Sequence, residues 1–356
     1  MTTSPLEESS VIAPLVPCCR STANTWCRSE VAVREHPAAD APGVRRSPRR
    51  CDDLPPRRWA ALPSGASTAR RHSAGWRTSV LQFQSEVRSD VGAVRSNNED
   101  SAFAGSTLLM VADGVGGAAA GEVASASVTY VVSAAALLAT PGWAPDELLL
   151  QTFRFAHRQI LDEAQACAER WGMATTATAV LTDGRSVTIA HVGDSRAYRY
   201  ARGRLTQLTR DDSFLQDLLD TGEVQPADAA AFAYRNLITK SIGQQGELEV
   251  AVVPVELRSG DRILVCSDGV SDVLDEVELA RALSSERRAA DDIVALALER
   301  GSSDNVTCVV ADVVDRPWVR PWGVLAGAGW NPGNLIDATA VRRRAGSENL
   351  QLSGAD

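Results

Sequence analysis

Several residue types that carry common site chemistries are scarce in this chain of 356 residues. Lysine occurs once, at Lys240, beside 35 arginines, and there are only four histidines and three methionines. No uninterrupted apolar run reaches the roughly 18 residues that a membrane span needs. The seven cysteines are odd in number and scattered, so they indicate no disulfide framework. We therefore expect a cytoplasmic protein without a membrane span.

Charge is distributed unevenly along the chain. Residues 1–79 contain twelve arginines and seven acidic residues, a net charge of +5, whereas the whole chain carries −9. Residues 80–356 therefore carry −14. A nucleic-acid partner normally requires a basic face, so we expect no such partner. A strongly acidic region instead suits a site that gathers divalent cations.

Four aspartates in separate segments give the strongest functional signal. They are Asp113 in Val-Ala-Asp-Gly-Val-Gly-Gly (111–117), Asp194 in His-Val-Gly-Asp-Ser-Arg-Ala-Tyr (191–198), Asp268 in Val-Cys-Ser-Asp-Gly-Val (265–270) and Asp304 in Ser-Asp-Asn-Val-Thr (303–307). Three of them adjoin apolar runs of strand length, and a strand end is a rigid place from which to display a carboxylate. Oxygen ligands without neighbouring Cys or His favour Mg²⁺ or Mn²⁺ over zinc.

The sequence divides into three parts. Residues 1–79 are rich in Pro and Arg, which predicts either a disordered segment or a start assigned too early, with the protein beginning near Val80. Residues 80–315 show the periodicity of a folded domain, with an insertion of two short helices at about 212–240. Residues 316–356 contain several Trp and Gly without strong periodicity. For this tail we consider a docking segment and plain disorder.

Within residues 80–315, helical patterns occur as one early pair, over 118–138 and 145–171, and one late run, over 291–300. Hairpin patterns lie between them, over 175–192 and 197–208. This order differs from the strand–helix alternation of a parallel sheet. It favours antiparallel sheets covered by helices.

With Arg95-Ser-Asn-Asn-Glu99-Asp100 upstream, the ordered motifs resemble the metal-dependent protein phosphatases of type 2C in their bacterial form. The matching blocks run from Ser89 to about Val314. The resemblance implies an α+β fold, a four-layer αββα sandwich of two antiparallel sheets flanked by helices, with metals in the cleft between the sheets. It also implies a monomeric protein serine/threonine phosphatase that acts on phosphorylated proteins, opposes a bacterial Ser/Thr kinase, and uses two core Mn²⁺ or Mg²⁺ ions.

The resemblance also implies a role for each matched residue. The implied metal-binding set is Glu99, Asp100, Asp113, Gly114, Asp194, Asp268 and Asp304. In this scheme Asp113 bridges both core ions, and the Gly114 carbonyl binds one of them. Asp194 joins Asp268 at a third, weaker ion. Arg95 binds the phosphate, because a guanidinium offers paired donors that Lys cannot copy. The implied catalytic set is Arg95, Asp113, Asp268 and Asp304.

The chain departs from the family pattern at several positions. Eukaryotic relatives carry a His two residues after the first metal aspartate, as a general acid, and this chain has Val115 there. Protonation of the leaving group would then come from water, for which a third ion offers a place. Other departures are Ala118, Ala174 and Asp212, and none of these is an implied metal ligand.

Two alternatives to an active kinase-opposing phosphatase remain. A pseudophosphatase would act as a binding or scaffold module, but it would have no need to keep all of the aspartates. A phosphatase of a partner-switching regulator of sigma factors usually carries an upstream sensor domain, which residues 1–79 do not resemble.

Overall fold

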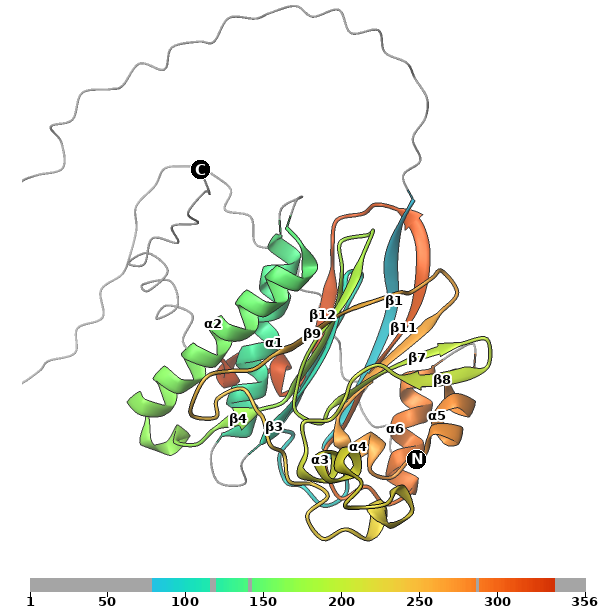
Figure 1. Ribbon diagram of the computed structural model, residues 1–356. Helices are drawn as coiled ribbons and strands as arrows, with labels where there is room; N and C mark the ends of the chain where they lie inside the picture. Colours follow the sequence, from blue (N-terminus) through green and yellow to red (C-terminus); the bar gives the residue numbers. More distant parts are fainter. Residues whose placement is uncertain (1–78, 116–119, 140–142, 286–287, 337–356) are drawn as a thin grey trace, which may run out of the picture. The chain divides into compact units, whose positions relative to one another are not determined.

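The computed structural model describes residues 79–115, 120–139, 143–285 and 288–336. The expectations for residues 1–78, for the glycines at 116 and 117, and for residues 337–356 lie outside this part of the chain. The described residues form two antiparallel sheets and the helices that cover them (Figure 1).

The larger sheet has seven strands, with the order β12-β2-β3-β5-β6-β9 and with β4 paired to β3. Their bounds are β2 Asp100–Gly105, β3 Leu108–Val115, β4 Ala174–Thr175, β5 Ala177–Thr182, β6 Val187–Val192, β9 Ala251–Val255 and β12 Gly323–Gly327. All of the pairings are antiparallel. The expected 175–192 hairpin is confirmed as β5–β6.

The smaller sheet has five strands in the order β1-β11-β10-β7-β8, again antiparallel throughout. Their bounds are β1 Ser79–Asp90, β7 Arg196–Ala201, β8 Arg204–Gln207, β10 Arg262–Cys266 and β11 Val306–Pro317. The two longest strands, β1 and β11, pair over their whole length. The 197–208 hairpin pattern corresponds to β7–β8.

Alternation along the strands builds three hydrophobic cores. In β3, Leu109 and Val111 face the other sheet and contribute to the core between the sheets, together with Val265 and Val309 of the smaller sheet. Met110 points the opposite way, into a core with the first two helices. The same alternation in the smaller sheet feeds a third core with the late helices.

Helices cover the outer face of each sheet. α1 (Gly121–Leu138) and α2 (Pro145–Ala166) pack on the larger sheet, and α5 (Glu276–Leu283) and α6 (Ala289–Glu299) pack on the smaller one. Figure 1 shows the resulting order of helices, sheet, sheet and helices. The predicted four-layer αββα sandwich is therefore confirmed.

Helix α1 has the length and hydropathy of a membrane span, with a mean hydropathy of 1.4 over 18 residues. However, 61% of this helix is buried inside the protein, and buried side chains such as Val128 and Val132 belong to the core shared with α2 and the larger sheet. These contacts are those of a core helix.

The segment at 212–240 contains α3 (Phe214–Thr221) and the 3-10 helix η2 (Pro226–Ala231), as expected for a helical insertion. A bridge between Ser213 and Ile238 closes its base. The short helix α4 (Asp268–Ser271) lies near α3 at the lower end of the sheets in Figure 1.

The domain boundary expected at residue 315 is wrong. β11 continues to Pro317, and β12 adds an edge strand to the larger sheet by pairing with β2. Further along, the buried Ile336 joins the core under α1, and its backbone N–H donates to the Ser127 hydroxyl at 3.0 Å. The folded domain therefore extends at least to residue 336.

Candidate metal and phosphate site

The pairing of β2 with β3 places two carboxylates side by side. Asp100 is the first residue of β2, and it lies directly opposite Asp113 of β3. Asp100 alternates with Ala102, and Asp113 with Val111, both of which belong to the core between the sheets. The two acids therefore stand on the inner face, at the end of the sandwich. Like charges directly opposite one another destabilise a strand pair, so this pair needs a positive counter-charge.

Burial and mutual repulsion raise the pKa values of these acids. Burial raises the pKa of Asp100 to about 7, and the charges of Asp268 and Asp304 add to this effect, while hydrogen bonds such as that from the Ser267 hydroxyl at 2.7 Å oppose it. The pKa of Asp113 lies well above its usual value, because of burial first and then of the charge on Asp100.

Two further acids, Asp268 and Asp194, interact electrostatically with Asp100 and Asp113. Asp268 begins α4 directly after β10, and burial, followed by the charges of Asp272 and Asp304, raises its pKa to about 6. Asp194 lies in the turn between β6 and β7, and burial, followed by the charge of Asp268, raises its pKa well above the usual value. Acids from four chain segments thus act electrostatically on one another.

Three of these carboxylates have an oxygen that is buried and makes no hydrogen bond within the described residues: Asp100 Oδ1, Asp194 Oδ1 and Asp268 Oδ1. A buried oxygen of this kind is costly unless it meets a donor or a cation. Within the described residues, no three His, Cys, Asp or Glu side chains lie close enough together to coordinate one metal ion as they stand. The donors are nevertheless all hard oxygens, which fit Mg²⁺ or Mn²⁺.

Arg95 lies beside this cluster, where the predicted phosphate-binding residue should be. Its Nη2 donates to Asp304 Oδ2 at 2.7 Å, and the Arg95 side chain is about half exposed. Glu99 and Asp113 lie near enough for their charges to act on the guanidinium. An exposed guanidinium next to buried acids can reach an incoming phosphate.

Asn305 holds the loop that carries Arg95, a role that the sequence reasoning missed. Its side-chain oxygen accepts the backbone N–H of Glu99 at 2.8 Å. Its side-chain nitrogen donates to the carbonyls of Val91 and Asn97, both at 2.9 Å. The available signal was its position directly after Asp304 in the Ser-Asp-Asn-Val-Thr motif.

Gly114 is required by a close backbone approach. A Cβ at this position would lie 2.6 Å from the carbonyl oxygen of Gly121 and 2.8 Å from that of Glu99. Such contacts would force apart the β3 end, the start of α1 and the Glu99 loop. Glu99 has a raised pKa, caused by burial and then by the charge of Glu122. Glu99 and Gly114 therefore lie together, as their shared predicted role requires.

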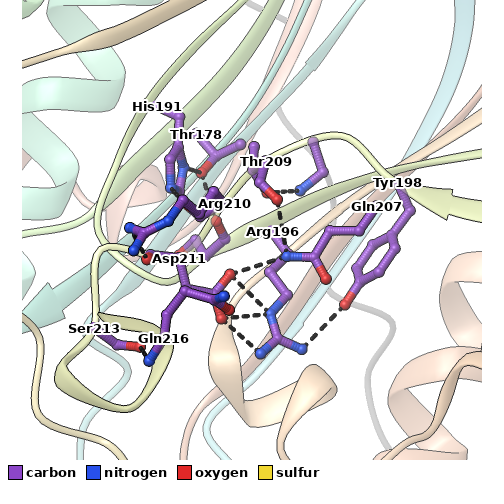
Figure 2. A network of polar contacts seen from close by, with 12 residues as sticks. Thr178, His191, Arg196, Tyr198, Gln207, Thr209, Arg210, Asp211, Ser213 and Gln216 are labelled. Atoms are coloured by element: carbon purple, nitrogen blue, oxygen red, sulfur yellow. Dashed lines mark hydrogen bonds and ion pairs between the residues drawn. The ribbon is translucent and has the colours of Figure 1, made fainter. Parts of the chain in front are cut away.

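A polar network that includes Arg196 and Asp211, shown in Figure 2, adjoins in sequence the turn that carries Asp194. Arg196 donates to both carboxylate oxygens of the buried Asp211, at 2.6–3.0 Å, and to the Tyr198 hydroxyl at 3.3 Å. The backbone N–H of Gly193 also donates to Asp212 Oδ2 at 3.1 Å. These bonds tie the Asp194 turn to the base of the 212–240 insertion.

The structure thus brings all of the residues singled out from the sequence to one end of the sandwich. Their roles as ligands remain predictions.

No His stands at the position after Asp113 where eukaryotic relatives carry a general acid, because that position is Val115, the last residue of β3. The described residues contain two histidines, and the side chains of both make hydrogen bonds elsewhere. His157 bonds the Gly246 carbonyl and the Gly243 N–H. His191 bonds Thr178 and the Arg210 carbonyl. Neither is free to act as a general acid.

Comparison with known proteins identifies the family of this chain. The family model for protein phosphatase 2C matches residues 93–311. Over 255 residues the chain is 42% identical to serine/threonine protein phosphatase PstP of Mycobacterium tuberculosis, covering 70% of this chain and 48% of that protein. It is 33% identical over 241 residues to serine/threonine phosphatase stp of Listeria monocytogenes, covering 65% of this chain and 96% of the relative.

Solved structures give the same result. The M. tuberculosis PstP/Ppp crystal structure matches with a TM-score of 0.63 and 40% identity, over 65% of this chain and 99% of that chain. The catalytic domain of PstP in complex with two manganese ions matches with a TM-score of 0.62 and 40% identity, over 66% and 100% of the two chains. The chain belongs to the protein phosphatase 2C family. It spans about half the length of the curated M. tuberculosis relatives, 48% of each.

Proposed function

We propose that this chain is a metal-dependent protein phosphatase that hydrolyses phosphoserine and phosphothreonine in proteins. The observation that carries the proposal is the set of buried carboxylate oxygens on Asp100, Asp194 and Asp268 that have no hydrogen-bond partner among the described residues. The charges of these three acids act on Asp113, which in turn lies close enough to act on the guanidinium of Arg95. Family membership and the names of the relatives support the same activity.

The donors proposed to hold two core Mn²⁺ or Mg²⁺ ions are Glu99, Asp100, Asp113, the Gly114 carbonyl, Asp268 and Asp304. When bound, such ions supply a water of lowered pKa and positive charge against the phosphate. The PstP catalytic domain in complex with two manganese ions supports this number and this metal. We further propose that Asp194, with Asp268, holds a third and weaker ion.

Arg95 would bind and orient the phosphate. Guanidinium N–H groups match two phosphate oxygens at once. In this structure the Arg95 side chain binds Asp304, so substrate phosphate must compete with that carboxylate. Asn305 restricts the positions that the Arg95 side chain can reach, because it holds the backbone of the Arg95 loop at Glu99 and Asn97.

The leaving group must take its proton from water. Val115 occupies the place of the general acid of eukaryotic relatives, and both histidines in the described residues are already hydrogen-bonded. We propose that Asp194 positions the water that donates this proton. The 212–240 insertion, tied to the Asp194 turn through Asp212, is the segment proposed to contact the substrate protein.

The proposed setting is a bacterial cytoplasm, where a monomeric enzyme opposes a Ser/Thr kinase. The test of the activity is hydrolysis of a phosphothreonine peptide by the whole chain, with Mn²⁺, with Mg²⁺ and with excess EDTA. We expect turnover with either metal and none with EDTA. Asp113→Asn should lose at least ~10²-fold in turnover, because charge stabilisation of the transition state is removed. Full activity in EDTA would sink the metal mechanism.

A further inference from the structure

A hollow lies on the β7–β8 hairpin, away from the carboxylate cluster. It has a volume of about 340 Å³, and four arginines line it: Arg199, Arg202, Arg204 and Arg258. Ala201 and Thr206 complete the lining. None of these residues belongs to the proposed catalytic machinery.

The hairpin register explains why the arginines gather. Arg199 lies opposite Thr206, and Ala201 lies opposite Arg204, so all four side chains share one face of the hairpin. The other face carries Tyr198 and Leu205, which pack in the core with α5 and α6. Arg258 reaches the same hollow from the connection between β9 and β10.

The positive charge of the hollow is only partly paired with acidic groups of the described residues. Arg199 Nη2 is paired with Asp261 Oδ2 at 2.8 Å, but its Nε is buried and has no hydrogen-bond partner within the described part of the chain. Arg202, Arg204 and Arg258 make no ion pair with any described residue. Three arginines without an ion pair to any described residue and one buried donor without a described partner therefore meet here, although residues 80–356 carry a net charge of −14.

Clustered guanidinium groups recognise phosphate and carboxylate groups through charge-assisted, paired hydrogen bonds. The acidic surroundings disfavour a long polyanion such as a nucleic acid, because only this small area would attract it. A short segment with one or two concentrated negative charges fits better. Recognition of phosphorylated or acidic motifs by arginine clusters is a recurrent mode of peptide binding.

We propose that this hollow binds a second phosphate group on the phosphoprotein substrate, and so selects substrates that are phosphorylated at two positions. This inference rests on the proposed phosphatase activity and extends it to the substrate class. β7 connects the two sites, since Asp194 precedes Arg199 by five residues and Arg202 by eight. At roughly 3.3 Å per residue of strand, the hollow lies ~16–26 Å from the Asp194 turn.

This distance sets the spacing that the substrate needs. An extended peptide covers at most ~3.3–3.6 Å per residue, so the second phosphate should lie at least about five to eight residues from the one that is hydrolysed. A second phosphate two residues away could not reach the arginines and should give no advantage.

The test compares phosphothreonine peptides that carry no second phosphate, or a phosphoserine two or eight residues away. We expect only the eight-residue spacing to lower KM, by about tenfold, with kcat unchanged, as charge-assisted bonds to two guanidinium groups would give. Arg204→Gln/Arg258→Gln should abolish this advantage, because both side chains line the hollow and neither has an ion pair to lose among the described residues. Arg154→Gln/Arg158→Gln, on exposed positions of α2, removes the same charge and should preserve the advantage.

Aryl phosphate hydrolysis separates the two proposals. If aryl phosphate is turned over but the doubly phosphorylated peptide has no advantage, or keeps it in the Arg204/Arg258 variant, the substrate-class inference is overturned and the phosphatase activity stands. Fluorescence anisotropy of the labelled peptides measures their binding to the hollow, and EDTA prevents hydrolysis during the measurement. Equal binding of all three peptides, with inorganic phosphate competing at the arginines, would mean that the site takes free phosphate and would overturn the peptide proposal.

Discussion

A buried carboxylate that serves a metal should destabilise the metal-free domain at neutral pH. Asp268 provides the sharpest case, because one of its oxygens is buried without a hydrogen-bond partner in the described part of the chain and its pKa is raised to about 6 from 3.8. Asp268→Asn keeps the shape of the side chain and removes the charge. We therefore expect this substitution to stabilise the metal-free protein while it removes activity.

The size of the effect follows from the pKa. A difference between 3.8 and about 6 corresponds to at most about 3 kcal/mol of ionisation cost above pH 6. Although this one oxygen is enclosed, Asp268 as a whole is only partly buried and solvent screens its charge, so we expect ~1–2 kcal/mol. For a domain of this size, that gain raises the Tm by ~2–8 °C.

The pH dependence has a defined sign. Because the folded-state pKa of Asp268 is raised, the stability that protonated Asp268 contributes is fully present below pH 3.8 and is lost as pH rises through about 6. The advantage of Asp268→Asn should therefore be largest at pH 7.5 and should shrink as pH falls towards 4. With Mn²⁺ present, the wild-type protein should be more stable than Asp268→Asn, since the ion binds the folded wild-type protein more tightly than the folded variant.

The assay is thermal unfolding in EDTA at a series of pH values, with and without Mn²⁺. Asp211→Asn is the matched control, because Asp211 is also buried but is held by Arg196 through three hydrogen bonds. Removing this partner leaves a mostly buried guanidinium unpaired and should cost ~3 kcal/mol. A Tm for Asp268→Asn below that of wild type in EDTA at pH 7.5, or a gain independent of pH, would refute the reasoning.

Three further predictions concern other residues of the site and the fold. Asp194→Ala should reduce turnover of phosphothreonine more than that of an aryl phosphate, whose better leaving group needs little protonation; equal losses would indicate a general structural role. Asn305→Ala should lower kcat/KM by ~10-fold or more through the Glu99 loop, with metal titration and Tm showing whether the loss is local or global. Truncation after residue 315 should lower the Tm strongly relative to the whole chain, because it removes β12 and the buried Ile336, and an unchanged Tm would contradict the packing described above.

The sequence was sufficient for the fold class and for the gathering of the acids, because both depend on ordered motifs next to apolar runs. It was insufficient for elements that depend on tertiary packing. β2 (Asp100–Gly105) is short and wholly buried, so it lacks the alternation that marks a half-exposed strand. β12 (Gly323–Gly327) is bounded by glycines and forms only because β2 offers an edge.

One missed element did carry a signal. α5 begins with a capping box, in which the Asp275 side chain accepts the backbone N–H of Glu278 and the Glu278 side chain accepts that of Asp275. The pattern of an acid followed three residues later by Glu is readable in the sequence. The Asn305 contacts had no comparable local pattern, because their partners lie more than 200 residues away along the chain.

The strand register ties the site to the cores of the fold. Asp113 follows Leu109 and Val111 on the inner face of β3, while Met110 and Ala112 lie in the core with α1 and α2. A slip of one residue would reverse every side chain of the strand. It would turn Asp113 away from Asp100 and push Met110 between the sheets. The free energy of the apolar cores thus holds the two carboxylates opposite each other, against their own repulsion.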